Sequence, residues 1–191
     1  MSAISVPWNT QLLEQLDWHW TNHVRPRWDG LTDDEYFWEP VADCWSVRRV
    51  GEGGAAVQAG SGEWRCDYAQ PEPDPAPVTT IAWRLAHLIV GIFGERCHSH
   101  FDGPAISYDD FAYAGSAAEA LEQLDDGYAR WVEGVRSLGE DGLRRECGPA
   151  EGPYAEHPLS ELVLHINREA IHHGADILLL RDLYLRTTPR P

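Results

Sequence analysis

The sequence contains no lysine: its 15 basic residues are all arginines, and they face 31 acidic residues, giving a formal net charge of −16 with neutral histidines. Because nothing offsets the long-range repulsion from phosphate groups, this balance argues against a nucleic-acid partner and against an anionic membrane surface. No apolar run approaches the roughly 20 residues that cross a bilayer, so we expect no membrane association.

Cysteine is also scarce, and its spacing is irregular. Cys44, Cys66, Cys97 and Cys147 form no disulfide framework, although the first two are able to pair across a hairpin. The N-terminal segment lacks the basic start and apolar core of an export signal. We therefore expect a cytoplasmic protein with reduced thiols.

The length and the apolar content indicate a folded chain. A chain of 191 residues fits one domain with a real core, so we expect a single domain over 1–191. A hydrophobic content of 43% with 10% aromatics excludes a disordered chain. Nine histidines and nine tryptophans are the unusual part of the composition.

Four segments repeat apolar residues at helical spacing. They cover about 9–27, 79–100, 116–138 and 158–186. Thr79 or Thr80 is a suitable N-cap for the second segment. Four long helices joined by loops predict an all-α protein built as an antiparallel four-helix bundle.

The segment 43–78 differs from the rest of the chain. Its stretches DCWSVRRV and EWRCDYA have the aromatic and β-branched content of short strands, and a Gly-rich run separates them. Proline at every second position from 71 to 77 then predicts an extended connector. We expect a short β-hairpin-like insertion with a Pro-rich loop between the first and second helices.

Polar residues on the apolar stripe of the last helix suggest a metal site. Glu169 and His173 are four residues apart, which places them on one face. A buried carboxylate costs several kcal/mol unless it is paired or metal-bound. His87, in the middle of the second helix, is the candidate third ligand, and this donor set suits zinc, nickel or iron. The alternative is a local Glu–His pair with a hydrogen-bonded core histidine.

The same segments carry a family resemblance. HINREAIHHGADILLLRDLY resembles the last-helix signature of the DinB superfamily, H-x-x-x-H-x-x-G-Q followed by Leu-rich sequence. IAWRLAHLIVGIFGE is similar to the second helix of that superfamily, which carries its first metal-binding histidine. The resemblance covers nearly the whole chain apart from 43–78. Two positions depart from the pattern: Glu169 replaces a histidine, and Asp176 replaces the usual glutamine.

A glutamate at that ligand position resembles the mycothiol-dependent maleylpyruvate isomerase branch, in which His, Glu and His hold zinc. The resemblance therefore implies that His87, Glu169 and His173 bind a divalent metal, with zinc favoured and nickel possible. It also implies a small-molecule substrate, a mycothiol-type thiol cosubstrate, transferase or isomerase activity, and a homodimer. A metal-dependent hydrolase and a non-catalytic metal- or ligand-binding scaffold remain alternatives.

Four further residues are weaker candidates for the surroundings of the site: Trp83, His165, His172 and Arg168. We expect the indole to pack beside His87, and the two histidines to orient Glu169 or to line the cavity. Arg168, with Arg84, is suited to bind a substrate carboxylate through two hydrogen bonds. Solvated surface positions are the alternative for the histidines and arginines.

A second H-x-x-x-H pair, His19 and His23, lies on the first helix. No partner ligand is evident for it, so we expect packing or surface placement there.

Overall fold

The computed structural model describes residues 6–188, and its main helices match the four predicted segments. The helices are α1 (Trp8–His19), α2 (Asp33–Tyr36), α3 (Ile81–His87), α4 (Glu95–His100), α5 (Ala117–Gly142) and α6 (Leu159–Thr187). Two π-helical segments, η1 (Trp20–Val24) and η3 (Leu88–Gly94), and two 3₁₀ segments, η2 (Arg25–Trp28) and η4 (Pro149–Tyr154), complete the helical structure. The prediction of a four-helix bundle is confirmed, with α3, η3 and α4 forming its second helix.

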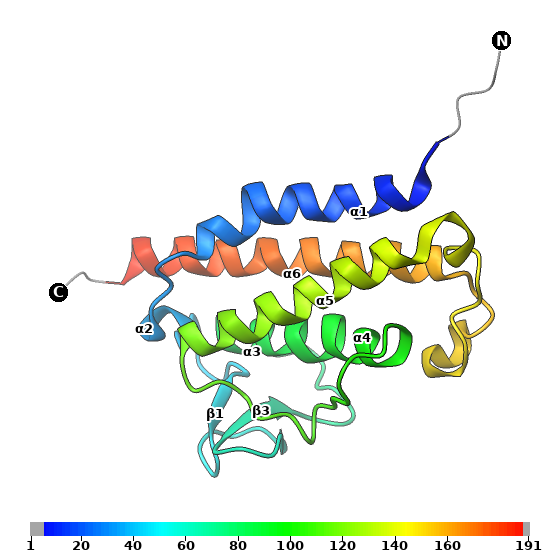
Figure 1. Ribbon diagram of the computed structural model, residues 1–191. Coiled ribbons are helices and arrows are strands. Elements are labelled where there is room, and N and C mark those ends of the chain that lie inside the picture. The colour runs from blue at the N-terminus through cyan, green and yellow to red at the C-terminus, as the bar shows by residue number, and fades with distance from the viewer. Residues whose placement is uncertain (1–5, 189–191) are drawn as a thin grey trace.

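The long helices run in two directions (Figure 1). α1 and α6 point one way, and α3–α4 and α5 point the other way. Contacts at both ends of the first pair agree with this view, because Asn167 donates to the Leu12 carbonyl and Arg27 pairs with Asp182. The crossover segment 101–116 returns the chain from the end of α4 to the start of α5. α3 and α6 are therefore antiparallel neighbours that face each other along the site.

An aromatic cluster fills the core between three of the bundle helices. The Trp20 side chain is 2% exposed and stacks on Tyr128 of α5, with ring centroids 4.6 Å apart. Its edge contacts Trp28 and Phe93. Aromatic rings bury large areas and gain further energy from stacked and edge-on contacts, so this cluster holds η1, η2, η3 and α5 together.

Two carboxylates in the bundle, the buried Glu35 and the half-exposed Asp125, are paired with arginines. The Glu35 side chain is 3% exposed and accepts a hydrogen bond from Arg181 of α6. Asp125 of α5 accepts two hydrogen bonds from Arg25 at the end of the first helix. A guanidinium matches a carboxylate with two parallel bonds, so these pairs meet the desolvation cost that an isolated carboxylate would carry.

The insertion forms a three-stranded antiparallel sheet that lies against α3. Its strands are β1 (Val47–Arg49), β2 (Val57–Ala59) and β3 (Trp64–Tyr68), in the order β1-β3-β2. The predicted pairing of the first and last strands is confirmed, whereas β2 lies in the Gly-rich run that was expected to be only a connection. Trp83 of α3 donates its indole N–H to the Asp67 carbonyl, which fixes the sheet to the bundle.

The four cysteines are free thiols in the described structure, so Cys44 and Cys66 do not pair. Within residues 6–188, no helix has both the length and the apolar character needed to cross a membrane.

Two tryptophans on the first helix provide a test of the core. Trp20→Ala empties the centre of the aromatic cluster and should lower the free energy of unfolding by about 3–5 kcal/mol. Trp18→Ala is the matched control, because the Trp18 side chain is 61% exposed and its loss should change stability by less than about 0.5 kcal/mol. Urea unfolding followed by circular dichroism at 222 nm measures both. Equal losses in the two variants would contradict this packing.

Candidate metal centre

Two of the three predicted ligands, His87 of α3 and His173 of α6, are in contact, and the third, Glu169, lies beside His173. The rings of His87 and His173 are perpendicular, with centroids 4.7 Å apart. Nε2 of His173 lies 3.6 Å from a carboxylate oxygen of Glu169, one turn earlier on α6. Their side chains are largely buried, with 13% of His173 and 25% of Glu169 exposed. His87 of α3 thus lies against His173 of α6, and His173 in turn lies beside Glu169.

His87 is held by two aromatic residues. Its Nδ1 lies 2.7 Å from the Tyr108 hydroxyl, and its ring stacks on Trp83 at 5.5 Å between centroids. Trp83 was expected beside His87, and it lies there. Tyr108 belongs to the crossover segment 101–116, which the sequence marked only as a loop. A hydrogen bond to one ring nitrogen fixes the tautomer and leaves the other nitrogen free for a ligand.

Gly91 makes room for this hydrogen bond. A Cβ atom at this position would collide with the Tyr108 hydroxyl and would also come within 3.3 Å of Nδ1 of His87. Gly91 lies in the π-helical segment η3, which begins directly after His87. Segments of π-helix occur frequently at functional sites. Glycine is therefore required here for the space it leaves beside the imidazole.

Burial keeps both imidazoles neutral. Desolvation lowers the pKa of His87 to about 4, and the neighbouring His173 lowers it further. Desolvation and the Arg84 guanidinium likewise lower the pKa of His173. A histidine binds a metal only in its neutral form, so the state of the two rings at neutral pH fits a metal ligand.

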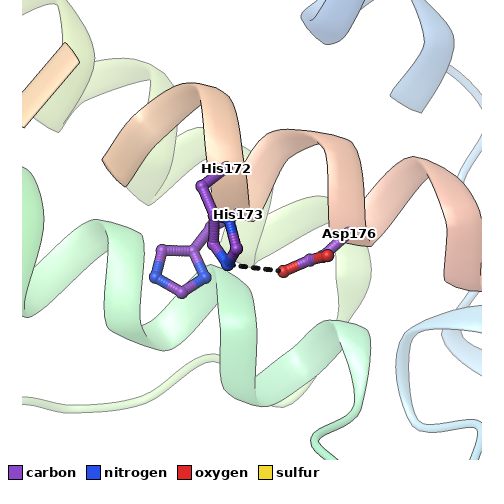
Figure 2. A group of neighbouring side chains, drawn as sticks. All are labelled: His172, His173 and Asp176. Carbon is purple, nitrogen blue, oxygen red and sulfur yellow. Dashed lines mark ion pairs between the residues drawn. The ribbon is translucent and has the colours of Figure 1, made fainter. Parts of the chain in front are cut away.

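A second donor group shares His173. Ligand atoms of His172, His173 and Asp176 all lie within 4.8 Å of one another, and these residues are able to hold a metal ion. Figure 2 shows the three side chains projecting from α6, with Nε2 of His172 paired to Asp176 at 3.4 Å. His172 is 65% exposed.

Arg84 occupies one side of this second group. Its guanidinium donates to Asp176 and lies 3.4 Å from Nδ1 of His173. A cation bound to Asp176 would have to displace or adjoin this permanent positive charge, which costs energy. Nε2 of His173, the other ring nitrogen, is the one near Glu169. Both carboxylates therefore have an arginine beside them, Arg84 at Asp176 and Arg168 at Glu169, and the two groups share His173.

The remaining predicted residues lie at the rim. His165 Nδ1 is 3.7 Å from Glu169, and Arg168 Nε is 3.4 Å from the same oxygen. Arg168 also contacts His165 directly. Away from this region, the rings of His19 and His23 lie 5.9 Å apart on the first helix, and the exposed Trp18 packs on His23.

The sequence was compared with known families, with curated proteins and with solved structures. The DinB superfamily profile matches residues 15–177. The chain belongs to the DinB superfamily. No curated protein and no solved structure matched it.

The match contains both donor groups and Tyr108, so the candidate centre lies within the DinB bundle itself. The donors come from the second and last helices of this DinB chain, and both helices lie mainly inside the matched range.

The buried His87 makes stability depend on pH in a defined direction. Its pKa falls from 6.5 in the unfolded chain to about 4 in the folded one, so between these values the unfolded chain binds more protons. Stability present above pH 6.5 is therefore lost as the pH falls, by about 1.4 kcal/mol per pH unit and about 3 kcal/mol in total at pH 4.

Urea unfolding of the metal-free protein between pH 4 and 7 tests this slope. The His87→Gln variant lacks the titrating group and should show a correspondingly shallower dependence. Parallel slopes for the two proteins would show that His87 does not titrate as described.

The Tyr108 hydroxyl provides a second test at the same imidazole. Tyr108→Phe removes the partner of Nδ1 and should weaken zinc binding by about 10–100-fold. Gly91→Ala should act in the same direction, because its Cβ displaces the same hydroxyl. Tyr68→Phe, which removes a hydroxyl on the exposed end of β3, is the control. Unchanged zinc affinity in Tyr108→Phe, measured by competition with a chromogenic chelator, would exclude this role.

Proposed function

We propose that this DinB protein is a divalent-metal-dependent enzyme that uses a low-molecular-weight thiol of the mycothiol type for S-transfer or isomerisation. In this proposal His87, Glu169 and His173 hold the metal, with zinc favoured and nickel the alternative. The observation that carries it is the contact of two largely buried, neutral imidazoles, His87 and His173, with the Glu169 carboxylate 3.6 Å from His173. Two imidazoles with one carboxylate are a donor set typical of catalytic zinc sites, which keep a position open.

A divalent cation held there supplies a Lewis acid that lowers the pKa of a thiol or water bound beside it. The chain's own residues do the positioning. Tyr108 orients the His87 ring through Nδ1, and Trp83 covers one face of that ring. Arg84 ties Asp176 to α3, which fixes the separation of the two helices that provide the donors.

Metal binding tests the ligand set before any reaction is assayed. Protein purified without a histidine tag should bind close to one zinc or nickel ion per chain by elemental analysis. Glu169→Gln should weaken zinc binding by roughly 100-fold or more, because it removes a charged ligand. Asp176→Asn is the matched control about two turns further along α6, and a change below ~10-fold is expected because that residue would act only through its neighbours.

A larger loss of zinc affinity in Asp176→Asn than in Glu169→Gln would show that the ion binds to the group of His172, His173 and Asp176. A chain that takes up neither zinc nor nickel would overturn the metal-dependent function altogether.

Thiol chemistry needs its own assay. The metal-loaded protein should consume mycothiol or an analogous thiol in the presence of a model electrophile, and His173→Ala should abolish the activity while keeping its helical circular dichroism. Hydrolysis of a model ester without any thiol would favour the hydrolase alternative. A metal-loaded protein that is inert to both would be a binding scaffold.

A further inference from the structure

A cavity lies next to the candidate metal centre, where α4 and the start of α6 meet the loop that contains η4. Its volume is about 760 Å³, within the range of small-molecule sites. Arg96 of α4, Tyr154 of η4, and Leu164 and Arg168 of α6 are among its lining residues. Helix, loop and helix thus enclose a space of ligand size that none of the candidate ligands lines.

Two residues of α6 connect the cavity to the candidate centre. His165 and Arg168 line the cavity, and both also lie within 4 Å of the Glu169 carboxylate. A molecule in the cavity that contacts Arg168 is therefore about one helical turn from the proposed metal ligands.

The cavity contains two permanent positive charges in a chain of net charge −16. The Arg96 side chain is 23% exposed, and its Nε is buried without a hydrogen bond, although Glu151 lies 3.3 Å away. The same Glu151 oxygen also lies 2.9 Å from Nε2 of the buried His100, and this hydrogen bond lowers the pKa of Glu151. Arg96 also lies 3.4 Å from Glu95, and its Nε is the donor that is left without a hydrogen bond.

The apolar part of the lining lies on the outer side. The Leu164 and Tyr154 side chains are 53% and 62% exposed in a described structure that otherwise buries most of its large apolar residues. Such contacts beside fixed charges are typical of a site for a molecule with one apolar end and one anionic end. Glu151 and Glu161 also line the cavity, so a singly charged group fits better than a doubly charged phosphate.

We propose that this cavity binds an apolar monocarboxylic acid, with its carboxylate between Arg96 and Arg168 and its apolar part along Leu164 and Tyr154. As the substrate site of the metal centre, the cavity rests on the proposed function, and Arg168, which lines the cavity and lies 3.4 Å from Glu169, connects the two. Guanidinium groups bind carboxylates through paired, charge-assisted hydrogen bonds.

The test uses 3-phenylpropionate and its uncharged amide, 3-phenylpropionamide, as a matched pair of probes. Isothermal titration of the full, metal-free chain should show binding of the acid and at least ~10-fold weaker binding of the amide. Arg168→Gln should lower the affinity for the acid by about 10-fold and leave the affinity for the amide unchanged. Arg168 is 69% exposed, so this variant should fold.

Arg136→Gln is the control, since Arg136 is an exposed arginine paired with Glu133 on α5. It should bind both probes as the natural chain does. Equal affinity for acid and amide, or an Arg168→Gln variant that binds the acid normally, would overturn the carboxylate site. Tighter binding of phenyl phosphate than of 3-phenylpropionate would overturn the monocarboxylate class.

Repeating the titration with zinc separates this site from the proposed function. Acid binding that requires zinc and survives Arg168→Gln would place the carboxylate on the metal, which overturns the cavity site and leaves the metal centre standing. Acid binding that depends on Arg168 in a chain that takes up no metal would support the cavity site and overturn the proposed metal centre.

Discussion

The perpendicular contact between two buried imidazoles, His87 and His173, is the interaction on which the rest of the site depends. Desolvation makes the charged form of each ring costly, so each neutral ring needs partners for its nitrogens. Tyr108 meets this need for His87, and Arg84 with Glu169 meets it for His173. Each partner brings another part of the chain with it. The position of the crossover segment, through Tyr108, and the packing of α3 on α6, through Arg84, therefore depend on the burial of these two rings.

Much of the bundle was predictable because helical periodicity is a local signal. The stripes of apolar residues in 79–100 and 158–186 predicted their helices to within about two residues at each end. β2 was missed, because its three residues lie between glycines and its pairing depends on a partner further along the chain. The direction of α5 was equally hidden. It depends on the path of the crossover 101–116, which carries no periodicity.

The candidate site was predictable where its residues share a helix, and unpredictable where they meet across helices. Glu169 and His173 follow from a spacing of four, and His87 from a polar residue on an apolar stripe. Tyr108 lies 21 residues from His87 and carried no local signal beyond an aromatic residue in a loop. The Arg84–Asp176 pair spans 92 residues. This pair gives a role to Asp176, which stands where the family pattern has a glutamine. A carboxylate forms an ion pair with the Arg84 guanidinium, whereas the neutral amide of a glutamine would not.

The π-helical segment η3 lies between His87 and α4 within one continuous helix. A π-helical stretch bonds each N–H to the fifth residue back, one further than an α-helix, and so accommodates an additional residue per turn. Each residue of an α-helix turns the chain by about 100°. An additional residue in a purely α-helical segment would turn His87 by about that angle relative to α4, whereas the wider π-helical turns of Leu88–Gly94 accommodate it within one continuous helix. The direction of the His87 imidazole relative to α4 therefore depends on the backbone hydrogen-bond pattern of Leu88–Gly94 as well as on the side chains of the site.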